Sequence, residues 1–364
     1  MRKLSISISC LFLSTNVWAD DATLSLRASS LAPLPEPVTN NAVTAVIAGE
    51  TEYLVSFAGI GDGLKYSDTH ARTFVLSEKS DKWIEHAPVP GGDGRLAATA
   101  TSVGALAYVF GGYSVAADGS EVSTPWVHSF DPKGGAFVEL SPMPIPVDDA
   151  VSVSYQDRYI YLVSGWHDLG NVNLVQRYDT ESDTWTQATP IPGTALFGHA
   201  GGIVGNKIVY CDGVAVLPHA DRSRSFAASG ECWLGMIDEK DGRKIDWRPI
   251  EPHPGLPRYR MAAAGVPALN AVLFLGGSEN PYNFDGMGYD GKPSEAATLG
   301  LLFSLKTSQW QVIKQDNAAS MDHRGLVLFQ RGWVTVGGML AEQVVTDKVT
   351  LYRLYPSNSF NRPH

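Results

Sequence analysis

The sequence predicts an all-β fold, a six-bladed β-propeller with four-stranded blades. Six doublets of small residues, each ending in glycine, close apolar runs along the chain: Ala58-Gly59, Gly111-Gly112, Ser164-Gly165, Asp212-Gly213, Gly276-Gly277 and Gly337-Gly338. Consecutive doublets lie 53, 53, 48, 64 and 61 residues apart. A period of roughly 50 residues is typical of propeller blades, so each interval is expected to hold one blade.

The same order of segments recurs within each interval. A strand of small residues precedes an apolar strand that ends at the doublet, and two further strands follow a variable loop. The second blade shows this order most clearly, with strands expected over 96–101, 105–112, 127–130 and 137–140. The first of these strands is rich in alanine because blades converge at the propeller axis, where larger side chains would collide.

The last strand of most blades carries an aromatic residue, and proline-containing segments then lead to the next blade. The aromatic residues are Trp83, Phe137, Trp185, Trp247 and Trp310. We expect them to fill the gaps between blades rather than to take part in chemistry. The proline-containing segments are 87–90, 141–144, 190–192 and 251–254.

The N-terminus resembles a secretory signal peptide over residues 1–19. Arg2 and Lys3 precede a short apolar stretch, and Val17 and Ala19 suit a cleavage site after Ala19. The stretch is too short to span a membrane. Cys10 lacks the context of a lipid-modified cysteine. Export predicts a periplasmic or secreted protein.

Residues 20–354 are expected to form a single propeller. The sixth blade ends near Leu354 without an outer aromatic strand, whereas the segment 22–30 has strand character and precedes a proline-containing passage. We therefore expect 22–30 to supply the missing strand and close the ring, which leaves no free sheet edge. Residues 355–364 are predicted to be a polar C-terminal tail.

Charge argues against nucleic acid as a partner. The formal net charge is -10, and loss of Arg2 and Lys3 with the signal peptide makes it -12. Such a chain repels a phosphate backbone, and it contains no basic run to overcome that repulsion. A local cationic pocket remains compatible with this charge.

Two cysteines remain after the expected cleavage, Cys211 and Cys232, one at each end of a long loop. An exported compartment permits a disulfide at the base of that loop, and two buried thiols are the alternative. Zinc is excluded because no four ligands cluster there.

The doublets, outer aromatics and prolines resemble kelch repeats over nearly the whole mature chain. Kelch propellers include interaction scaffolds, domains of copper radical oxidases and the exported N-acetylneuraminate epimerases, or sialic acid mutarotases. In its length, its single propeller and its export signal, the chain most resembles the last group. That resemblance implies a sugar or sugar-acid ligand and mutarotase or epimerase activity.

Polar residues precede the inner strand of every blade, and the loops after the doublets emerge at the same end of the propeller. These polar residues and their neighbours are Asn40, Asn41, Arg95, Asp148, Asp149, Phe197, His199, Arg258, Arg260, Asp322, His323 and Arg324. Arg95, Arg260 and Arg324 hold comparable places in three blades, so they are candidates to bind a ligand carboxylate. The alternative is that each arginine neutralises Asp148, Asp149 or Asp322 in a structural network.

Aromatic residues in the longest loops suit a sugar, whose ring faces are apolar and whose rim forms hydrogen bonds. Loop 278–296 contributes Tyr282 and Tyr289, and Trp166 follows the third doublet. Loop 214–230 is the other long loop. The alternative is that these aromatic residues only fold the loops back on themselves.

No cofactor or metal is predicted. Met287 stands where a calcium loop would need an oxygen ligand, and no pair of histidines suits copper. Anomer interconversion needs only a base and an acid, for which His199, His323, Asp149 and Asp212 are candidates by type. The epimerase family has a glutamate after an Asn-Gly pair in the fourth blade, but this chain has Val214 there, so that base is not carried over.

The sequence therefore predicts an exported propeller that binds a small carbohydrate or sugar acid, without spanning the membrane. Whether it is an enzyme stays open. The alternative function is a non-catalytic protein-interaction scaffold in the cell envelope.

Overall fold

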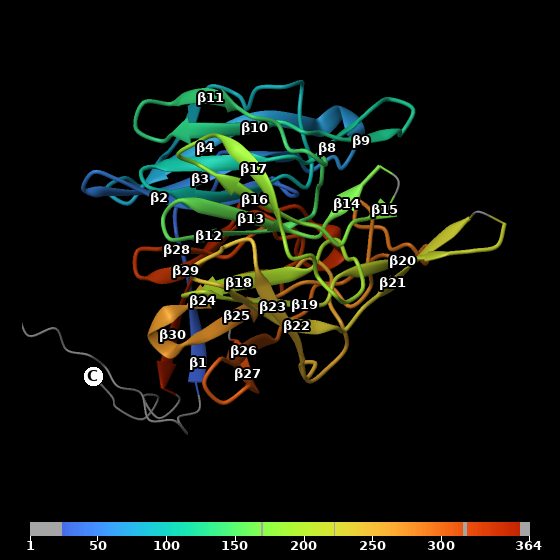
Figure 1. Cartoon of the computed structure of the whole chain (residues 1–364). Coiled ribbons are helices and arrows are strands. Elements are labelled where there is room, and N and C mark those ends of the chain that lie inside the picture. The colour runs from blue at the N-terminus through green and yellow to red at the C-terminus, as the bar shows by residue number, and fades with distance from the viewer. Residues whose placement is uncertain (1–23, 169, 222, 316–318, 357–364) are drawn as a thin grey trace, which may run out of the picture.

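The computed structural model describes residues 24–168, 170–221, 223–315 and 319–356. Six four-stranded antiparallel blades surround a central axis (Figure 1). A short parallel pairing of β1 (Leu24–Ser30) with β27 (Gln309–Gln315) joins two of the blades into one eight-stranded sheet. The described residues contain no α-helix and three short 3₁₀ helices, at Tyr66–Asp68, Pro267–Leu269 and Ala341–Gln343. The predicted six-bladed propeller is therefore confirmed.

The first three blades follow one another along the chain. Blade one contains β2 (Ala42–Ala48), β3 (Thr51–Ile60), β4 (Thr69–Ser77) and β5 (Trp83–His86). Blade two contains β6 (Thr99–Val103), β7 (Leu106–Phe110), β10 (Val127–Asp131) and β11 (Ala136–Leu140). Blade three contains β12 (Val151–Tyr155), β13 (Tyr159–Val163), β16 (Val175–Asp179) and β17 (Thr184–Ala188).

The other three blades complete the circle. Blade four contains β18 (Ala200–Val204), β19 (Lys207–Cys211), β22 (Cys232–Ile237) and β23 (Ile245–Ile250). Blade five contains β24 (Ala262–Val266), β25 (Ala271–Leu275), β26 (Gly300–Ser304) and β27 (Gln309–Gln315). Blade six contains β28 (Val327–Phe329), β29 (Gly332–Val336), β30 (Val349–Pro356) and β1 (Leu24–Ser30).

The N-terminal strand closes the ring, as predicted. β1 pairs antiparallel with β30 from Leu24 opposite Pro356 to Ser30 opposite Thr350, so it is the outer strand of blade six. Tyr355 and Pro356 are part of β30 rather than of the tail that we predicted, because this pairing extends the strand. The predicted signal peptide and the remainder of the tail lie outside the described residues.

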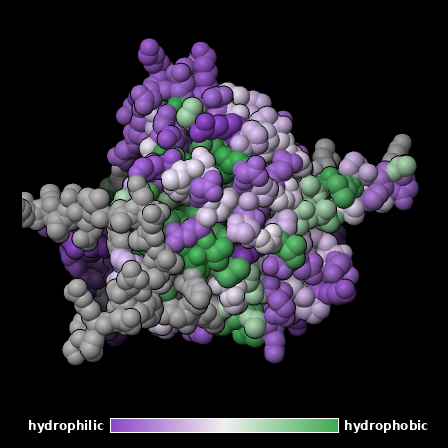
Figure 2. Space-filling view, turned by 90° about the horizontal axis from the view of Figure 1, so that it is seen from below, coloured by the Kyte–Doolittle hydropathy of each residue, from purple (hydrophilic) through white to green (hydrophobic). Residues whose placement is uncertain are grey.

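Three small hairpins rise from the loops that follow the doublets, and we call the end of the propeller that carries them the loop face. They are β8 (Tyr113–Val115) with β9 (Glu121–Ser123), β14 (Trp166–His167) with β15 (Gly170–Asn171), and β20 (Val214–Pro218) with β21 (Arg224–Ala228). The β20–β21 hairpin stands well clear of the propeller body in Figures 1 and 2.

The doublets need small residues because both members have a left-handed backbone. Gly111 and Gly112 have φ of 55° and 84°, and Ser164 and Gly165 have φ of 54° and 118°. A Cβ on Gly112 would also lie 2.6 Å from the carbonyl oxygen of Leu96. Glycine avoids both the backbone strain and the clash.

The outer tryptophans join neighbouring blades. Each indole donates a hydrogen bond to a carbonyl in the segment that leads into its own blade: Trp83 to Ala32 at 2.9 Å, Trp185 to Ser141 at 2.9 Å, Trp247 to Thr189 at 3.1 Å and Trp310 to Glu251 at 2.7 Å. Buried indoles normally need such a partner.

Candidate functional site

A ring of left-handed residues surrounds the propeller axis on the loop face. One residue before each inner strand has positive φ, and the six are Asn40, Ala97, Asp149, Gly198, Arg260 and Asp322. We call this set the axial ring. Backbone N–H groups link it from blade to blade, as in Asp149 to Ala97 at 3.0 Å, Gly198 to Asp149 at 3.0 Å and Arg260 to Gly198 at 2.8 Å.

Four charged side chains of three blades meet at the axial ring. Arg260 contacts Asp149 at 2.6 Å and Asp322 at 3.0 Å, and Arg324 contacts Asp149 at 2.8 Å and Asp322 at 3.1 Å. All four side chains are buried. Two arginines and two aspartates therefore alternate in a closed network, which we call the axial charge network.

Asp322 has the most donors in this network. Its Oδ2 accepts hydrogen bonds from the Thr39 hydroxyl and from the backbone and side-chain nitrogens of Asn40, at 3.1 and 2.7 Å for the latter two. Burial raises the pKa of Asp322, but the charges of Arg324 and Arg260 outweigh burial and hold the pKa below its usual value. The carboxylate is therefore ionised in the fold.

The network answers the question that the sequence left open about the arginines. Arg260 and Arg324 converge, but each guanidinium is bound to both aspartates. Arg324 also donates to the side-chain oxygen of Asn40. The geometry matches the structural alternative, in which arginines neutralise carboxylates of the protein.

Arg95 does not join the other two arginines, so their expected equivalence is wrong. It lies two residues before its axial-ring residue Ala97, as Arg258 does before Arg260. Arg95 donates to the carbonyl of Gly111 at 3.0 Å, and Arg258 approaches the equivalent carbonyl of Gly276 at 3.3 Å. Both arginines are buried between blades.

One cavity of the loop face, of about 310 Å³, lies beside the axial ring, and we call it the loop-face pocket. The hairpins, the axial ring and loop 278–296 line it with Tyr113, Glu121, Asp148, Asp149, Trp166, Phe197, Arg224, Phe226, Arg260, Asn283, Phe284 and Tyr289. Its size is at the lower end of the range for small-molecule sites.

Aromatic rings form one wall of the pocket. Phe226 stacks on Tyr289 with ring centroids 4.3 Å apart, and Trp166 packs against Phe197 at 5.4 Å and Phe226 at 6.0 Å. The structure therefore places Trp166 and Tyr289 together, in a wall that sequence reasoning proposed for a sugar.

Tyr282 does not line the pocket. Its ring is fully buried, 5.1 Å from that of Tyr259, and the Arg260 guanidinium lies 5.3 Å from its centroid. Its hydroxyl lies 3.4 Å from Asp322. Tyr282 thus supports the axial charge network from beneath, because loop 278–296 folds back against the propeller.

Two adjacent carboxyl groups in the pocket have different surroundings. Asp149 belongs to the axial charge network, whereas Asp148 accepts a hydrogen bond from the Ser123 hydroxyl at 2.7 Å. Burial raises the pKa of Asp148 well above its usual range, and the charge of Asp149 raises it further. Asp148 therefore holds its proton more tightly than a free aspartate does, beside a carboxyl group that pairs with two arginines.

The two candidate histidines lie in a different place, on the axial channel behind the ring. This channel of about 120 Å³ is lined by His199, His323, Asp149, Arg324 and residues of the inner strands, so it shares Asp149 with the loop-face pocket. Burial lowers the pKa of both histidines to about 4, so both are neutral at neutral pH. His199 Nε2 donates to the Val163 carbonyl at 2.9 Å, which leaves Nδ1 as an acceptor. Neither histidine lines the loop-face pocket.

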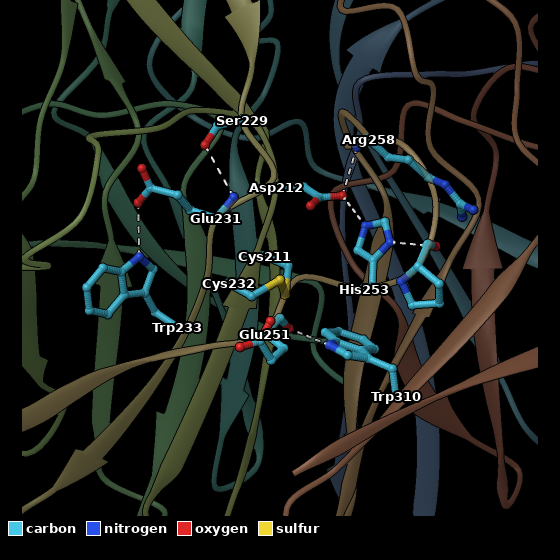
Figure 3. Close-up of a disulfide and its surroundings, with 11 residues drawn as sticks. Cys211, Asp212, Ser229, Glu231, Cys232, Trp233, Glu251, His253, Arg258 and Trp310 are labelled. Carbon is cyan, nitrogen blue, oxygen red and sulfur yellow. Dashed lines mark hydrogen bonds and ion pairs between the residues drawn. A yellow bond between two sulfur atoms is a disulfide. The ribbon is translucent and has the colours of Figure 1, made fainter.

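Asp212 is also separate from the pocket, because its side chain joins blades four and five (Figure 3). Its Oδ2 accepts from the Arg258 backbone N–H and from His253, both at 2.7 Å. Ser164 binds the Leu196 N–H in the equivalent place of blade three, at 2.9 Å. The candidate catalytic role of Asp212 is not supported by this position.

Cys211 and Cys232 form a disulfide next to Asp212, as Figure 3 shows. The two residues are directly opposite each other on β19 and β22. The bond fixes the base of the β20–β21 hairpin, which contributes Arg224 and Phe226 to the pocket.

Among the described residues, no three His, Cys, Asp or Glu side chains are grouped so that they could hold a metal ion. In the same part of the chain, no helix has the length and apolar character needed to cross a bilayer.

Comparison with known proteins agrees with this architecture. Residues 150–192, in blade three, match the Kelch motif. Blade three therefore carries a kelch motif. The solved structure of YjhT superposes with a TM-score of 0.69 over 90% of this chain and 100% of that chain, at 16% sequence identity. At this identity the likeness shows the fold.

Two curated relatives match parts of the chain. Beta-scruin of Limulus polyphemus is 29% identical over 183 residues, which cover 47% of this chain and 19% of that protein. Kelch-like protein 15 of Danio rerio is 26% identical over 109 residues, which cover 30% of this chain and 18% of that protein. The chain thus spans about a fifth of each relative's length.

Sequence reasoning missed several pocket residues, including Tyr113, Glu121 and Phe226. Tyr113 follows its doublet directly, as Trp166 does, and both residues pair with the segment leading into the inner strand. This position relative to the doublet is the signal that could have identified Tyr113. Phe226 and Glu121 lie on the second strands of hairpins that the sequence pattern does not reveal.

Proposed function

We propose that this protein binds a small polar ligand, a sugar or sugar acid, in the loop-face pocket. The observation that carries the proposal is the pairing of an aromatic wall, Trp166, Phe226 and Tyr289, with a polar rim. Sugar rings stack their apolar faces on such walls and form hydrogen bonds with such rims.

Anomer interconversion is the activity that these side chains support chemically. The acid Asp148 gives a proton to the ring oxygen as its bond to the anomeric carbon breaks, and Asp149 accepts the anomeric hydroxyl proton. An open-chain carbonyl forms. Reclosure on the other face returns both protons and yields the other anomer. Neither histidine takes part, because neither lines the loop-face pocket.

We place the protein in the periplasm or outside the cell. The N-terminal segment with the features of a signal peptide supports export, and the disulfide Cys211–Cys232 suits an oxidising compartment.

A thermal-shift series tests the binding proposal, because a ligand that binds only the folded state raises the unfolding midpoint. Wild type, Trp166→Ala and the control Tyr66→Ala are compared with hexoses, uronic acids and N-acetylneuraminate. Tyr66 is an exposed aromatic residue that does not line the pocket. We expect a shift in wild type and Tyr66→Ala that Trp166→Ala abolishes. No shift with any sugar would reject the proposal.

The second candidate, an interaction scaffold, is favoured by the projecting β20–β21 hairpin. Leu217 on this hairpin is 46% exposed, and both polar and apolar residues cover the projection in Figure 2. A partner protein would then contact the hairpin rather than the pocket. Replacing Leu217 with aspartate would reduce such binding, whereas Trp166→Ala would spare it.

A further inference from the structure

We infer that the loop-face pocket selects an uncharged sugar over a sugar acid, with Asp148 as the hydrogen-bond donor that recognises it. This inference rests on the proposed function and narrows its ligand class. It follows from the charges that face the pocket and from how each charge is already used.

Carboxyl groups outnumber guanidinium groups around the pocket. Glu121, Asp148 and Asp149 face Arg224 and Arg260. Arg260 lies 2.6 Å from Asp149 and 3.0 Å from Asp322, so its charge is already offset by two carboxylates of the protein. A ligand carboxylate would compete with both of them, and it would add a negative charge beside Asp149.

Arg224 also differs from an anion-binding arginine in its setting. It lies on β21 with its guanidinium 5.0 Å from the ring centroid of Trp166, the geometry of a cation–π contact. The side chain is exposed to solvent, where a single ion pair contributes little to affinity. Arg224 therefore extends the aromatic wall rather than forming a buried anion site.

Asp148 is the polar group best placed to recognise a neutral ligand. Its residue is 3% exposed, and its backbone is fixed by mutual hydrogen bonds with Trp166, at 3.0 and 2.9 Å. Its Oδ2 accepts from the Ser123 hydroxyl. No arginine, lysine or histidine of the described residues lies within ion-pair distance of its carboxyl group. The group is thus held rigidly in the pocket without a counterion.

The neighbours of Asp148 favour its protonated form. Ser123 binds it from β9, Asp149 and Arg260 lie on the axial ring, and Glu121, Arg224 and Tyr289 line the same pocket. Burial and then the charge of Asp149 raise its pKa most, and Glu121 raises it further, whereas the Ser123 hydrogen bond and the charge of Arg260 lower it; the net effect is a raised pKa. A protonated carboxyl group donates a hydrogen bond to a sugar oxygen, whereas a ligand carboxylate would add a further negative charge to the pocket.

Matched sugars that differ at one carbon test this inference. Binding of glucose and glucuronate, and of galactose and galacturonate, is measured at pH 6 by calorimetry or saturation-transfer NMR. We expect a neutral sugar to bind about tenfold tighter than its uronate, a difference of one buried hydrogen bond or more. A uronate that binds as tightly as its neutral partner, or tighter, would overturn the inference alone. Binding of no sugar would overturn the proposed function with it.

Two variants identify the residues responsible. Asp148→Ala is expected to weaken neutral-sugar binding about tenfold, by loss of that hydrogen bond. The control Asp118→Ala removes an exposed carboxylate of the β8–β9 turn that bonds only Ser120, and should leave affinity unchanged. Unchanged affinity in Asp148→Ala would overturn its role. Uronate binding that disappears in Arg224→Ala would show that Arg224 is an anion site after all.

Discussion

Individual carboxyl groups at and beside the axial ring have different partners within a few ångströms. Asp149 and Asp322 each pair with two arginines, whereas Asp148, next in sequence to Asp149, accepts a hydrogen bond from a serine hydroxyl. A guanidinium group within ion-pair distance favours the charged form of a carboxyl group, and Asp148 has none at that distance among the described residues. That is why the two arginines of the axial charge network are occupied by carboxyl groups of the protein, while Asp148 remains available to a ligand.

Removing the Arg260 guanidinium should destabilise the fold. In Arg260→Met, Asp149 and Asp322 each lose a buried partner, and we expect the free energy of unfolding to fall by about 3–5 kcal/mol. The control Arg158→Met breaks half-exposed pairs with Asp179 and Glu181, for which about 1 kcal/mol or less is expected. Urea unfolding measures both. Equal losses would contradict a buried network.

The two aspartates should respond to pH in opposite directions. Asp322 has a lowered pKa, so its stabilising effect is present above the unfolded value of about 3.9 and is lost as the pH falls below it. Asp322→Asn should therefore be most destabilising at neutral pH. Asp148 has a raised pKa, so its contribution is complete below about 3.9 and is lost as the pH rises toward the folded value.

Asp148→Asn should consequently gain stability relative to wild type as the pH rises from 4 to 7. Thermal unfolding of wild type and both variants across this range tests the pair of signs. Parallel curves for the two variants would show that the carboxyls do not differ as described.

At the scale of elements, the doublets set the geometry by which each blade meets the axial ring. The backbone of Gly112 has φ of 84°, and an added Cβ would meet the Leu96 carbonyl at 2.6 Å. We expect Gly112→Ala to lower the free energy of unfolding by about 2–4 kcal/mol, through strain and clash together.

Gly119, a glycine in a turn, allows the backbone strain to be measured without the clash. Gly119 has φ of 80° but open space where its Cβ would be, so Gly119→Ala should cost about 1 kcal/mol from backbone strain alone. Chemical unfolding of both variants gives the comparison. A cost for Gly112→Ala no greater than that for Gly119→Ala would mean that the close approach to Leu96 is unimportant.

The disulfide is the other element-scale constraint. Cys211 and Cys232 are 21 residues apart in sequence and close the loop that bears the β20–β21 hairpin. Replacing both with alanine should lower stability by about 3 kcal/mol, the chain-entropy value for a loop of this length. Differential scanning calorimetry with and without reductant tests it. Wild type should lose stability on reduction, and the double variant should not respond.

At the scale of the whole molecule, the ring closes through an N-terminal strand. We therefore expect the pairing of β1 with β30 to determine whether the propeller unfolds cooperatively. Leu26 in β1 is 2% exposed, and β1 covers the edge of β30. Leu26→Asp should expose that edge, lower the unfolding midpoint by at least about 10 °C and promote association. Arg27→Asp is the matched control, because that side chain is exposed on the same strand. Similar melting of both variants would contradict closure by β1.

The blade pattern and ring closure were predictable because they depend on local composition with a long period. The different positions of Arg95 and Arg260 were not predictable. Both lie 17 residues before the second glycine of their doublets, but the 3₁₀ helix Pro267–Leu269 lengthens the turn between the inner strands of blade five. That insertion moves Arg260 onto the axial ring and leaves Arg95 between blades.

The contents of the pocket also exceeded what the sequence could predict. Glu121, Phe226 and Asp148 come together from two hairpins and the segment before the inner strand of blade three, across three blades. Their proximity depends on how the hairpins fold over the loop face, which no single repeat encodes. The position directly after a doublet could locate Tyr113 and Trp166, but not their partners.

Crystals soaked with galactose at saturating concentration would show whether the loop-face pocket holds a sugar. We expect sugar density against Trp166 and Tyr289, with a sugar oxygen within hydrogen-bond distance of Asp148. Density at another place, or an empty pocket beside ordered Trp166 and Tyr289 side chains, would contradict it.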